Sequence, residues 1–403
     1  MLKSLRTFVT LATVLVLLGC GQPPQVAQPA QLKKAVLETY GEYRVGDEEL
    51  ELRGLETWWF SPPRTKEGEK LVDAYLLGDH ILMESNEKRL YGVDRTSGVP
   101  VLVAPLPYRC DFQGCEDSQM IYVSCRNIMV AVDKRGFVAY RKFLQFAPGG
   151  IAVTDETHVF VPCFDGRMRS YLKELGQEGY FDRQYSTGGN LEAKPALGTR
   201  YVYAGSNDGT LYALTVDRLD EAWSYKTNGP IRAGIVHDGR TVFVAGTDGN
   251  LYALNDMPQE TPEAQLDWHR PYACGESIQK TPYVAKTMVL VVNRKGECHA
   301  VDRKTGRGLW VVPDVEKVLT QGRLNTYLQR GNTVILAVDN QTGVVRWKID
   351  TRPGAFSFLL TNTQDDVIYL VKADGDTQAI REKKREEAAA PAAPPPPAPL
   401  QAP

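Results

Sequence analysis

Two stretches of the chain, YVYAGSNDGTLYAL at residues 201–214 and TVFVAGTDGNLYAL at residues 241–254, are near copies of each other. Each holds an alternating apolar run, an Asp-Gly pair and a second alternating run, with the pairs at Asp208 and Gly209 and at Asp248 and Gly249. Asp-Gly between alternating runs is a strong hairpin signal, because a two-residue turn needs positive φ at both central residues. Each stretch therefore predicts a β-hairpin.

Weaker copies of this hairpin extend in both directions along the chain. With the two stretches above they make eight copies, which begin at residues 80, 120, 158, 201, 241, 288, 325 and 367. The mean spacing is about 41 residues, and a period near 40 to 45 with several strands per unit is typical of a propeller blade. We therefore predict an all-β fold, a β-propeller of about eight four-stranded blades over residues 37–380.

A second motif follows several of the hairpins. Asp302 and Gly306 precede Trp310, and Asp339 precedes Trp347 with the same spacing to its Gly. Asp and Gly four apart favour a tight turn in which the carboxylate accepts hydrogen bonds from backbone N–H groups. We expect the Trp to start the outer strand and to pack between blades. Looser copies lie at Asp94 to Gly98, at Asp133 to Gly136, before Trp223 and, after a longer insertion, before Trp268.

The last repeat stops near residue 380 without an outer Trp strand, and an open ring would leave sheet edges exposed. Residues 42–60 contain the alternating run Glu49 to Leu52 and the pair Trp58 and Trp59. We expect this N-terminal segment to supply the missing outer strand and close the ring. The alternative is a separate N-terminal extension.

The N-terminus has the pattern of an export signal. Lys3 and Arg6 precede an apolar run from residue 8 to residue 18, which is too short for a transmembrane helix. The run ends in Leu-Leu-Gly-Cys at Cys20 and resembles the lipobox of bacterial lipoproteins, in which the Cys is acylated, for example by palmitate, and becomes the first mature residue. An ordinary secretory signal is the alternative.

Two further segments differ in composition from the repeats. Residues 20–36 are rich in Pro, Gln and Ala and are expected to form a flexible tether. Residues 381–403 are first densely charged and then almost wholly Ala and Pro, so they are expected to be disordered. The tail is interpreted as a spacer, or as a segment that binds cell-wall material or a partner's aromatic groove.

The repeat, with its Asp-Gly hairpin followed by Asp-x-x-Thr-Gly and Trp, resembles the pyrroloquinoline-quinone-like (PQQ-like) propeller family over residues 75–380. That family includes quinone-dependent dehydrogenases and also non-enzymatic lipoproteins of the BamB type, which serve the machine that assembles outer-membrane β-barrels. The resemblance implies the fold, and it leaves open which of these activities applies.

The sequence lacks the features that the enzymatic members carry. It has no adjacent Cys pair and no Cys-x-x-Cys-His haem motif, so we expect no catalytic residues, no cofactor and no metal. The Asp residues recur with the repeat and are interpreted as turn residues: Asp165, Asp208, Asp248 and Asp374. The five His residues are scattered and are interpreted as structural: His80, His158, His237, His269 and His299.

Six cysteines remain after Cys20, and an even number in an exported chain suggests disulfides. They are Cys110, Cys115, Cys125, Cys163, Cys274 and Cys298. Cys110 and Cys115 flank a short loop and are one candidate pair. Cys125 with Cys163, from neighbouring repeats, and Cys274 with Cys298 are the others. Metal binding and free buried thiols are the alternatives.

The net charge is −2 and charged residues, 24% of the chain, are mixed along it, which argues against nucleic-acid binding. Irregular loops at residues 105–114, 169–185 and 258–262 break the period and are interpreted as rim loops that bind partners, or as tolerated insertions. We expect a membrane-anchored scaffold of the bacterial envelope that binds other proteins. The BamB resemblance points to outer-membrane assembly, with the protein lipid-anchored to the outer membrane and facing the periplasm. The alternatives are a quinone-dependent oxidoreductase and a receptor for a sugar or peptide.

Overall fold

The computed structural model describes residues 44–62, 65–173, 176, 178–256, 266–351 and 355–383. The signal segment, Cys20, the tether, the Pro258 to Pro262 insertion and the Ala/Pro tail lie outside these residues. Within them no helix is long and apolar enough to cross a membrane.

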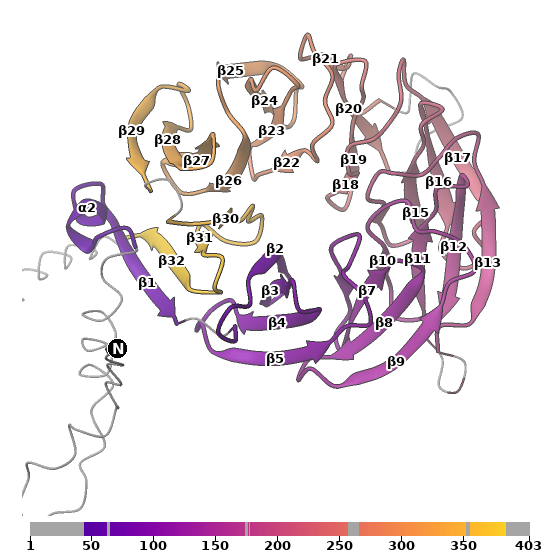
Figure 1. Cartoon of the computed structure of the whole chain (residues 1–403). Helices are drawn as coiled ribbons and strands as arrows, with labels where there is room; N and C mark the ends of the chain where they lie inside the picture. Colours follow the sequence, from indigo (N-terminus) through magenta and orange to yellow (C-terminus); the bar gives the residue numbers. More distant parts are fainter. Residues whose placement is uncertain are drawn as a thin grey trace, which may run out of the picture. The chain divides into compact units, whose positions relative to one another are not determined.

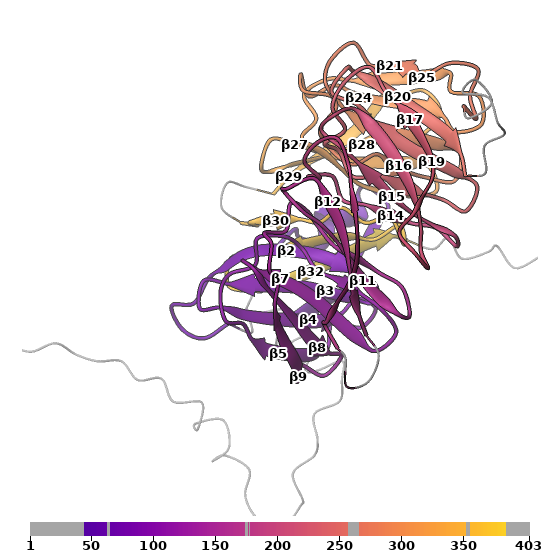
Figure 2. The same cartoon turned by 90° about the vertical axis from the view of Figure 1, so that its right-hand side faces the viewer.

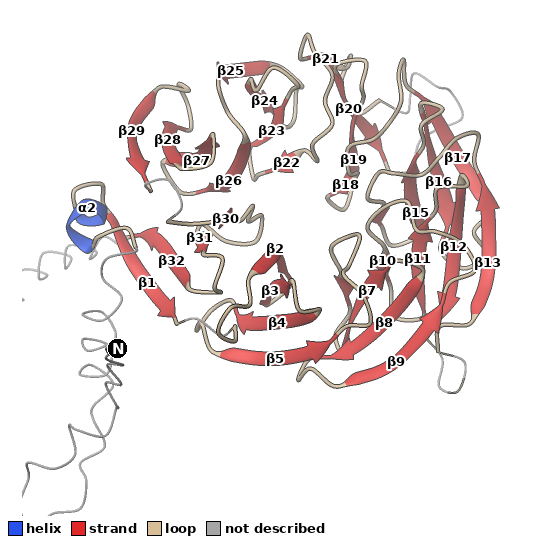
Figure 3. Cartoon of the chain, viewed as in Figure 1, coloured by secondary structure: helices blue, strands red, loops and turns tan. Residues whose placement is uncertain are grey.

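Eight four-stranded antiparallel sheets form the blades of a propeller, as predicted. Figure 1 shows the sheets following one another round a ring. Figure 3 shows strands and loops throughout the described chain, with one short helix. The second strand of each blade begins where the sequence repeat begins, within one residue.

The first four blades cover residues 71–226. Blade 1 contains β2 (Leu71–Leu77), β3 (His80–Ser85), β4 (Arg89–Asp94) and β5 (Pro100–Pro105). Blade 2 contains β6 (Cys115–Glu116), β7 (Met120–Cys125), β8 (Ile128–Asp133) and β9 (Val138–Phe143). Blade 3 contains β10 (Val153–Thr154), β11 (His158–Pro162), β12 (Arg167–Leu172) and β13 (Phe181–Ser186). Blade 4 contains β14 (Ala196–Leu197), β15 (Tyr201–Gly205), β16 (Thr210–Thr215) and β17 (Glu221–Lys226).

The other four blades complete the ring, which Figure 2 shows from the side. Blade 5 contains β18 (Val236–His237), β19 (Thr241–Ala245), β20 (Asn250–Asn255) and β21 (Tyr272–Ala273). Blade 6 contains β22 (Tyr283–Val284), β23 (Met288–Val292), β24 (Cys298–Asp302) and β25 (Gly308–Val312). Blade 7 contains β26 (Lys317–Gln321), β27 (Asn325–Arg330), β28 (Val334–Asp339) and β29 (Val345–Asp350). Blade 8 contains β30 (Phe358–Leu359), β31 (Ile368–Val371), β32 (Thr377–Glu382) and β1 (Leu55–Ser61).

The core lies between neighbouring blades rather than inside any one of them. One buried cluster joins Leu290 of blade 6 to Leu328 and Leu336 of blade 7. Another joins Phe243 of blade 5 to Val289 of blade 6. Because side chains alternate along a strand, each blade presents one apolar face to the blade before it and one to the blade after it.

The hairpin turns differ in detail from the prediction. The loop between β15 and β16 spans residues 206–209, and Gly209 takes positive φ (86°) while Asp208 does not. The loop closes with a hydrogen bond from Ser206 N to Thr210 O. The turn is therefore a four-residue loop, in which only the glycine needs the left-handed region.

Trp residues on the outer side of three blades donate a hydrogen bond to the turn of the next blade. Trp310 Nε1 donates to the Asn340 carbonyl at 3.0 Å. Trp268 donates to the Arg303 carbonyl at 2.9 Å, and Trp59 to that of Arg95 at 3.1 Å. Trp268 lies before β21 rather than within a strand. These hydrogen bonds join blade 6 to 7, blade 5 to 6 and blade 8 to 1, so we call them the Trp joints.

The glycine of the turn makes room for each Trp. A Cβ on Gly343, where φ is +73°, would lie 2.5 Å from Trp310 Cβ. Gly306 and Gly98 have the same relation to Trp268 and Trp59. The Asp-x-x-Thr-Gly motif is thus one half of a contact whose other half is the Trp of the preceding blade.

Blades 1 to 3 have no Trp at the equivalent position. The register places Trp310 opposite Ala300, and at the matching site β5 has Leu102 and β9 has Tyr140. In β13 the residue is Arg183, whose guanidinium donates to the Asp217 carbonyl in the turn of blade 4. The hydrogen bond is retained there, but the indole packing is not.

The N-terminal segment closes the ring as predicted, with β1 antiparallel to β32. The side chain of Gln378, fully buried, holds the two ends together: its Oε1 accepts from Val45 N, and its Nε2 donates to Val45 O and to Thr57 Oγ1, each at 3.1 Å. Closure leaves the strands of blade 8 without an unpaired outer edge on β32.

The alternating run Glu49 to Leu52 is not part of the closing strand. Residues Asp47–Glu51 form the short helix α2, and Leu50 is fully buried. Three acidic residues in the first turn favour a helix N-terminus, and four alternating residues are too few to distinguish a strand from one helical turn.

Candidate functional site

The recurring Asp residues lie in turns. Asp208 Oδ1 accepts from Thr210 N and Oδ2 from Tyr212 Oη, both at 2.7 Å. The Asp248 carboxylate accepts from Asn250 N and Tyr252 Oη in the same way. These carboxylates are occupied by their own hairpins, which agrees with the structural interpretation.

Two other turn carboxylates have local partners as well. Asp374 accepts from Asp376 N at 3.0 Å. Asp165 binds the guanidinium of the fully buried Arg169 through two hydrogen bonds of 2.8 and 2.6 Å. The hydrogen bonds and charge of Arg169 lower the pKa of Asp165. This pair fixes the Arg169 side chain within blade 3.

Four of the five His side chains lie beside a carboxylate, each in a different blade. The neighbours are Glu116 for His80, Asp182 for His158, Asp256 for His237 and Glu297 for His299. Burial lowers the pKa of His237 and of His299. His269 lies in the loop before β21. Among the described residues no three His, Cys, Asp or Glu side chains come together as a metal site.

None of the six described cysteines is bonded to another in the structure, and the sulfur atoms that come together are not those of a candidate pair. Cys110 Sγ lies 3.3 Å from Cys125 Sγ, not beside Cys115. Cys115 instead packs in one cluster with Cys163. Cys274 and Cys298 lie in the clusters on either side of blade 6. Spacing in the sequence did not reveal which loop folds back onto which strand.

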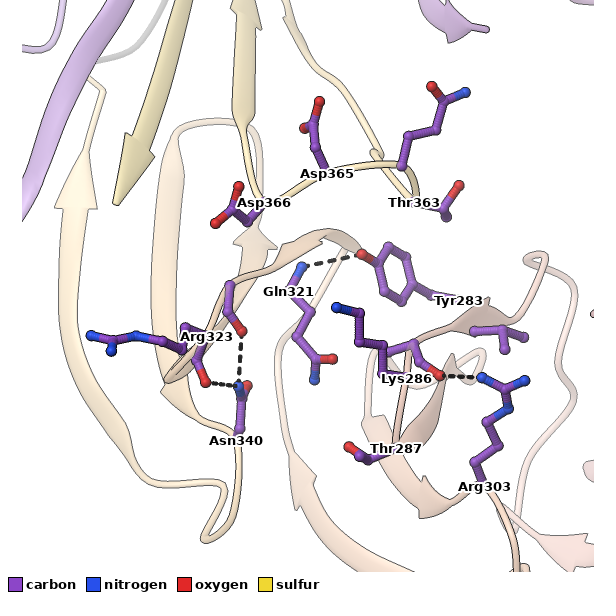
Figure 4. A pocket seen from close by; sticks show the side chains of 14 residues that line it. Tyr283, Lys286, Thr287, Arg303, Gln321, Arg323, Asn340, Thr363, Asp365 and Asp366 are labelled. Carbon is purple, nitrogen blue, oxygen red and sulfur yellow. Dashed lines mark hydrogen bonds between the residues drawn. The ribbon is translucent and has the colours of Figure 1, made fainter. Parts of the chain in front are cut away.

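A pocket of about 730 Å³ opens where the loops of blades 6, 7 and 8 converge (Figure 4). Part of its wall is fixed: Arg303 pairs with Asp238 and donates to the Ala285 carbonyl at 3.1 Å, and Asp365 pairs with Arg95. These ion pairs tie the pocket to blades 5 and 1, so they serve the ring itself.

Three other charged groups line the same pocket: Lys286, Arg323 and Asp366. Their side chains form no hydrogen bond or ion pair with the described residues. They offer two positive charges and one negative charge to a ligand. The pocket thus suits a molecule that carries charges of both signs, such as a peptide.

The centre of the ring holds a second cavity of about 480 Å³. Lys194, Lys280 and Lys317 line it from three different blades. Burial lowers the pKa of Lys194 and of Lys317, and Lys280 pairs with Glu316 at 2.6 Å. Glu316 therefore offsets part of the positive charge in this cavity.

A third cavity, of about 270 Å³, lies on the outside of blades 2 and 3 and is lined by aromatic residues. We call it the aromatic groove; its aromatic residues are Phe143, Phe146, Tyr171, Tyr180 and Phe181. Phe143 is 64% exposed and Tyr180 is 55% exposed. Large apolar side chains exposed side by side are typical of an interaction surface.

Two cations hold the groove in shape. Lys142 Nζ lies 3.3 Å from the centre of the Tyr180 ring. The Arg169 guanidinium, fixed by Asp165, lies 3.5 Å from that of Phe146. Such cation–π contacts orient the rings, so the groove is already formed without a partner.

Residues 234–335 match a family model, PQQ_2, described as "Outer membrane protein assembly factor BamB". The crystal structure of BamB from Moraxella catarrhalis has a TM-score of 0.64 at 18% identity, over 81% of this chain and 97% of that one. The fold is a BamB-like propeller. A computationally designed protein, Ika8, has a TM-score of 0.63 at 12% identity, over 80% of this chain and 98% of its own. None of the curated proteins compared with the chain matches it significantly.

The PQQ-like resemblance is confirmed at the level of repeat and fold. Because a designed protein matches as well as BamB does, the structural likeness shows the architecture alone. Function has to come from residues outside the repeat.

The sequence pointed to only part of the groove. Residues 169–185 were recognised because they break the repeat, and they contribute Tyr171, Tyr180 and Phe181. Phe143 was missed because on an outer strand an exposed aromatic residue has the same two-residue period as a buried one, and Phe146 was missed in the loop after that strand. Of the other two irregular loops, residues 105–114 hold Cys110, and residues 258–262 lie outside the described residues.

Proposed function

We propose that the protein is a non-enzymatic scaffold lipoprotein of the bacterial envelope that docks another envelope protein at the aromatic groove. The observation that carries this is the gathering of Phe143, Tyr180 and Phe181, exposed, on blades 2 and 3, which have no Trp at the position of Trp310. Exposed aromatic residues in a preformed hollow are the usual anchors of protein interfaces.

The specific partner that we propose is a component of the outer-membrane β-barrel assembly machinery. Support comes from the BamB family model over residues 234–335 and from the BamB-like propeller. Attachment to the outer membrane through acylated Cys20, facing the periplasm, completes the proposal. Its basis is the lipobox-like Leu-Leu-Gly-Cys that ends the apolar run.

The docking test is a pull-down of the tagged full chain after mild crosslinking in cells, with mass spectrometry of the recovered proteins. We expect an outer-membrane β-barrel protein with its accessory lipoproteins. The double variant Phe143→Ala with Phe181→Ala should lose them, whereas Phe137→Ala should retain them, because Phe137 is as exposed (69%) but lies outside the groove. Recovery of the same proteins by all three would refute docking at the groove.

The anchoring test is separate. Cys20→Ser should abolish labelling with a palmitate analogue and release the chain from the membrane fraction. Continued labelling of that variant would contradict acylation at Cys20.

A second candidate function, a receptor for a peptide, is favoured by Lys286, Arg323 and Asp366 in the pocket of Figure 4. Calorimetry with charged peptides tests it. Binding that Lys286→Ala weakens would support the receptor, and heat of dilution alone would exclude it.

A further inference from the structure

The loop between β5 and β6 places one thiol directly against another. Cys110 lies in this loop, half-buried, and Cys125 is the last residue of β7, fully buried. Their Sγ atoms are 3.3 Å apart, and both belong to one apolar cluster between blades 1 and 2. No other two described cysteines have sulfur atoms in hydrogen-bonding distance.

The backbone around the pair is fixed by hydrogen bonds. Asp111 N donates to the Ser124 carbonyl at 3.1 Å, so the loop runs alongside the end of β7. Cys110 N donates to Glu84 Oε1 at 2.9 Å. The two thiols therefore face each other because the chain on both sides is held in register, not through a chance rotamer.

We propose that Cys110 and Cys125 form a disulfide in the exported protein, while Cys115, Cys163, Cys274 and Cys298 remain thiols. Closing the remaining gap takes a small movement of the loop, since a disulfide needs about 2.05 Å between the sulfur atoms. The bridge would tie the loop to the cluster between blades 1 and 2.

The chemistry balances with a disulfide as oxidant, such as oxidised glutathione or a thiol–disulfide oxidoreductase. The Cys110 thiolate, the more accessible of the two, attacks the oxidant and expels one of its sulfurs as a thiol. Cys125 then attacks Cys110 Sγ and expels the second. The two cysteines lose two electrons and two protons, and the oxidant becomes two thiols.

The environment of the pair sets how fast it reacts. The neighbouring Cys125 thiol and burial raise the pKa of Cys110. Because the thiolate is the attacking species, the bridge should form faster as the pH rises.

The bridge has a consequence for the central cavity. Gln113 of the same loop lines that cavity, and Gly114 N donates to Tyr75 Oη at 2.9 Å. Oxidation of Cys110 would therefore fix one wall of the central cavity, and reduction would free it.

The test is a peptide map of the detergent-extracted full chain, alkylated before digestion and kept unreduced. Trypsin cuts after Arg109 and Arg126 and leaves Cys110, Cys115 and Cys125 in one peptide; Glu-C then cuts that peptide after Glu116. We expect residues 110–116 and 117–126 to remain joined, with Cys115 alkylated. Separate peptides with an internal Cys110–Cys115 bond, or alkylation of all six cysteines after treatment with oxidised glutathione, would overturn the proposal.

Variants give an independent readout. Cys110→Ser should lower the melting temperature by about 4 °C, the value expected for loss of a 15-residue loop closure, and should speed tryptic cleavage at Arg109. Cys163→Ser, the matched control, should leave that cleavage unchanged. Equal cleavage rates in Cys110→Ser, in Cys163→Ser and in the reduced and oxidised parent protein would also contradict the bridge.

Discussion

The Trp joints and the outer surface of blades 2 and 3 differ in the contacts that neighbouring blades make. At the joints, an indole from one blade fills the space above a glycine in the turn of the next, as Trp310 does over Gly343. On blades 2 and 3 the indole is missing, with Tyr140 and Arg183 at its position, and aromatic side chains face outward. Where the repeat is intact, its Trp and Gly residues join neighbouring blades. Where the repeat is interrupted, exposed aromatic side chains form a surface for a partner.

The largest expected effect comes from removing an indole at a joint. Trp310→Ala leaves a cavity between blades 6 and 7 and should cost about 3–5 kcal/mol. Tyr140→Ala, at the matching position of blade 2, should cost less, because Tyr140 is only half-buried and its hydroxyl has no partner among the described residues. Denaturant unfolding of both variants measures this, and equal losses would remove the distinction between the two regions.

A glycine pair sharpens the same point. Gly343→Ala combines positive φ with a Cβ 2.5 Å from Trp310 and should cost about 2–4 kcal/mol. Gly331→Ala has positive φ but no atom within 4 Å of the added Cβ, so it should cost only about 1 kcal/mol. The difference in unfolding free energy isolates the contact with the indole. If the two variants are equally stable, the glycine of the motif serves the turn alone.

Ring closure should depend on one amide. Gln378→Leu leaves both Val45 backbone groups without their partner and should cost about 1–3 kcal/mol. Gln341→Leu, an exposed change on blade 7, should be close to neutral. Hydrogen exchange of β1 reports the closure directly: faster exchange in the Gln378 variant alone is expected. Unchanged exchange in that variant would mean that strand pairing closes the ring without the hydrogen bonds of Gln378.

The smallest effect is a pH dependence of the joints. Hydrogen bonds from Thr305 lower the pKa of Asp302, and those from Arg346 and Thr342 lower that of Asp339. Their stabilising effect is thus present above the ordinary value of 3.8 and is lost as the pH falls below it. Asp302→Asn should flatten the fall in melting temperature between about pH 4 and pH 2. An unchanged slope in this variant would show that other carboxylates dominate the acid response.

Most of the fold could be predicted from the sequence because each repeat corresponds to one blade. Asp-Gly turns fix the hairpins, and the eight repeat starts coincide with the second strands. Within the closing segment the sequence did not place the strand, because the short pattern from Glu49 to Leu52 fits either a strand or one turn of helix. The approach of Cys110 to Cys125 was not among the candidate pairs, because it arises where a loop without periodicity folds back onto β7.

The candidate site was less predictable than the fold. Residues 169–185 could be recognised because they break the period. The groove also contains Phe143 and Phe146 from a blade with a regular repeat. Their exposure depends on the neighbouring blade leaving them uncovered, and that is a property of the assembled ring.

The most direct test of the central claim is photocrosslinking in cells from single positions on the ring. A photoreactive amino acid replaces Phe143 in the groove, or Val344, which is 62% exposed on blade 7 beside a Trp joint. The account predicts a discrete adduct with an envelope protein from position 143 and none from position 344. Adducts of the same protein from both positions, or from position 344 alone, would contradict the claim that the interrupted part of the ring is the docking surface.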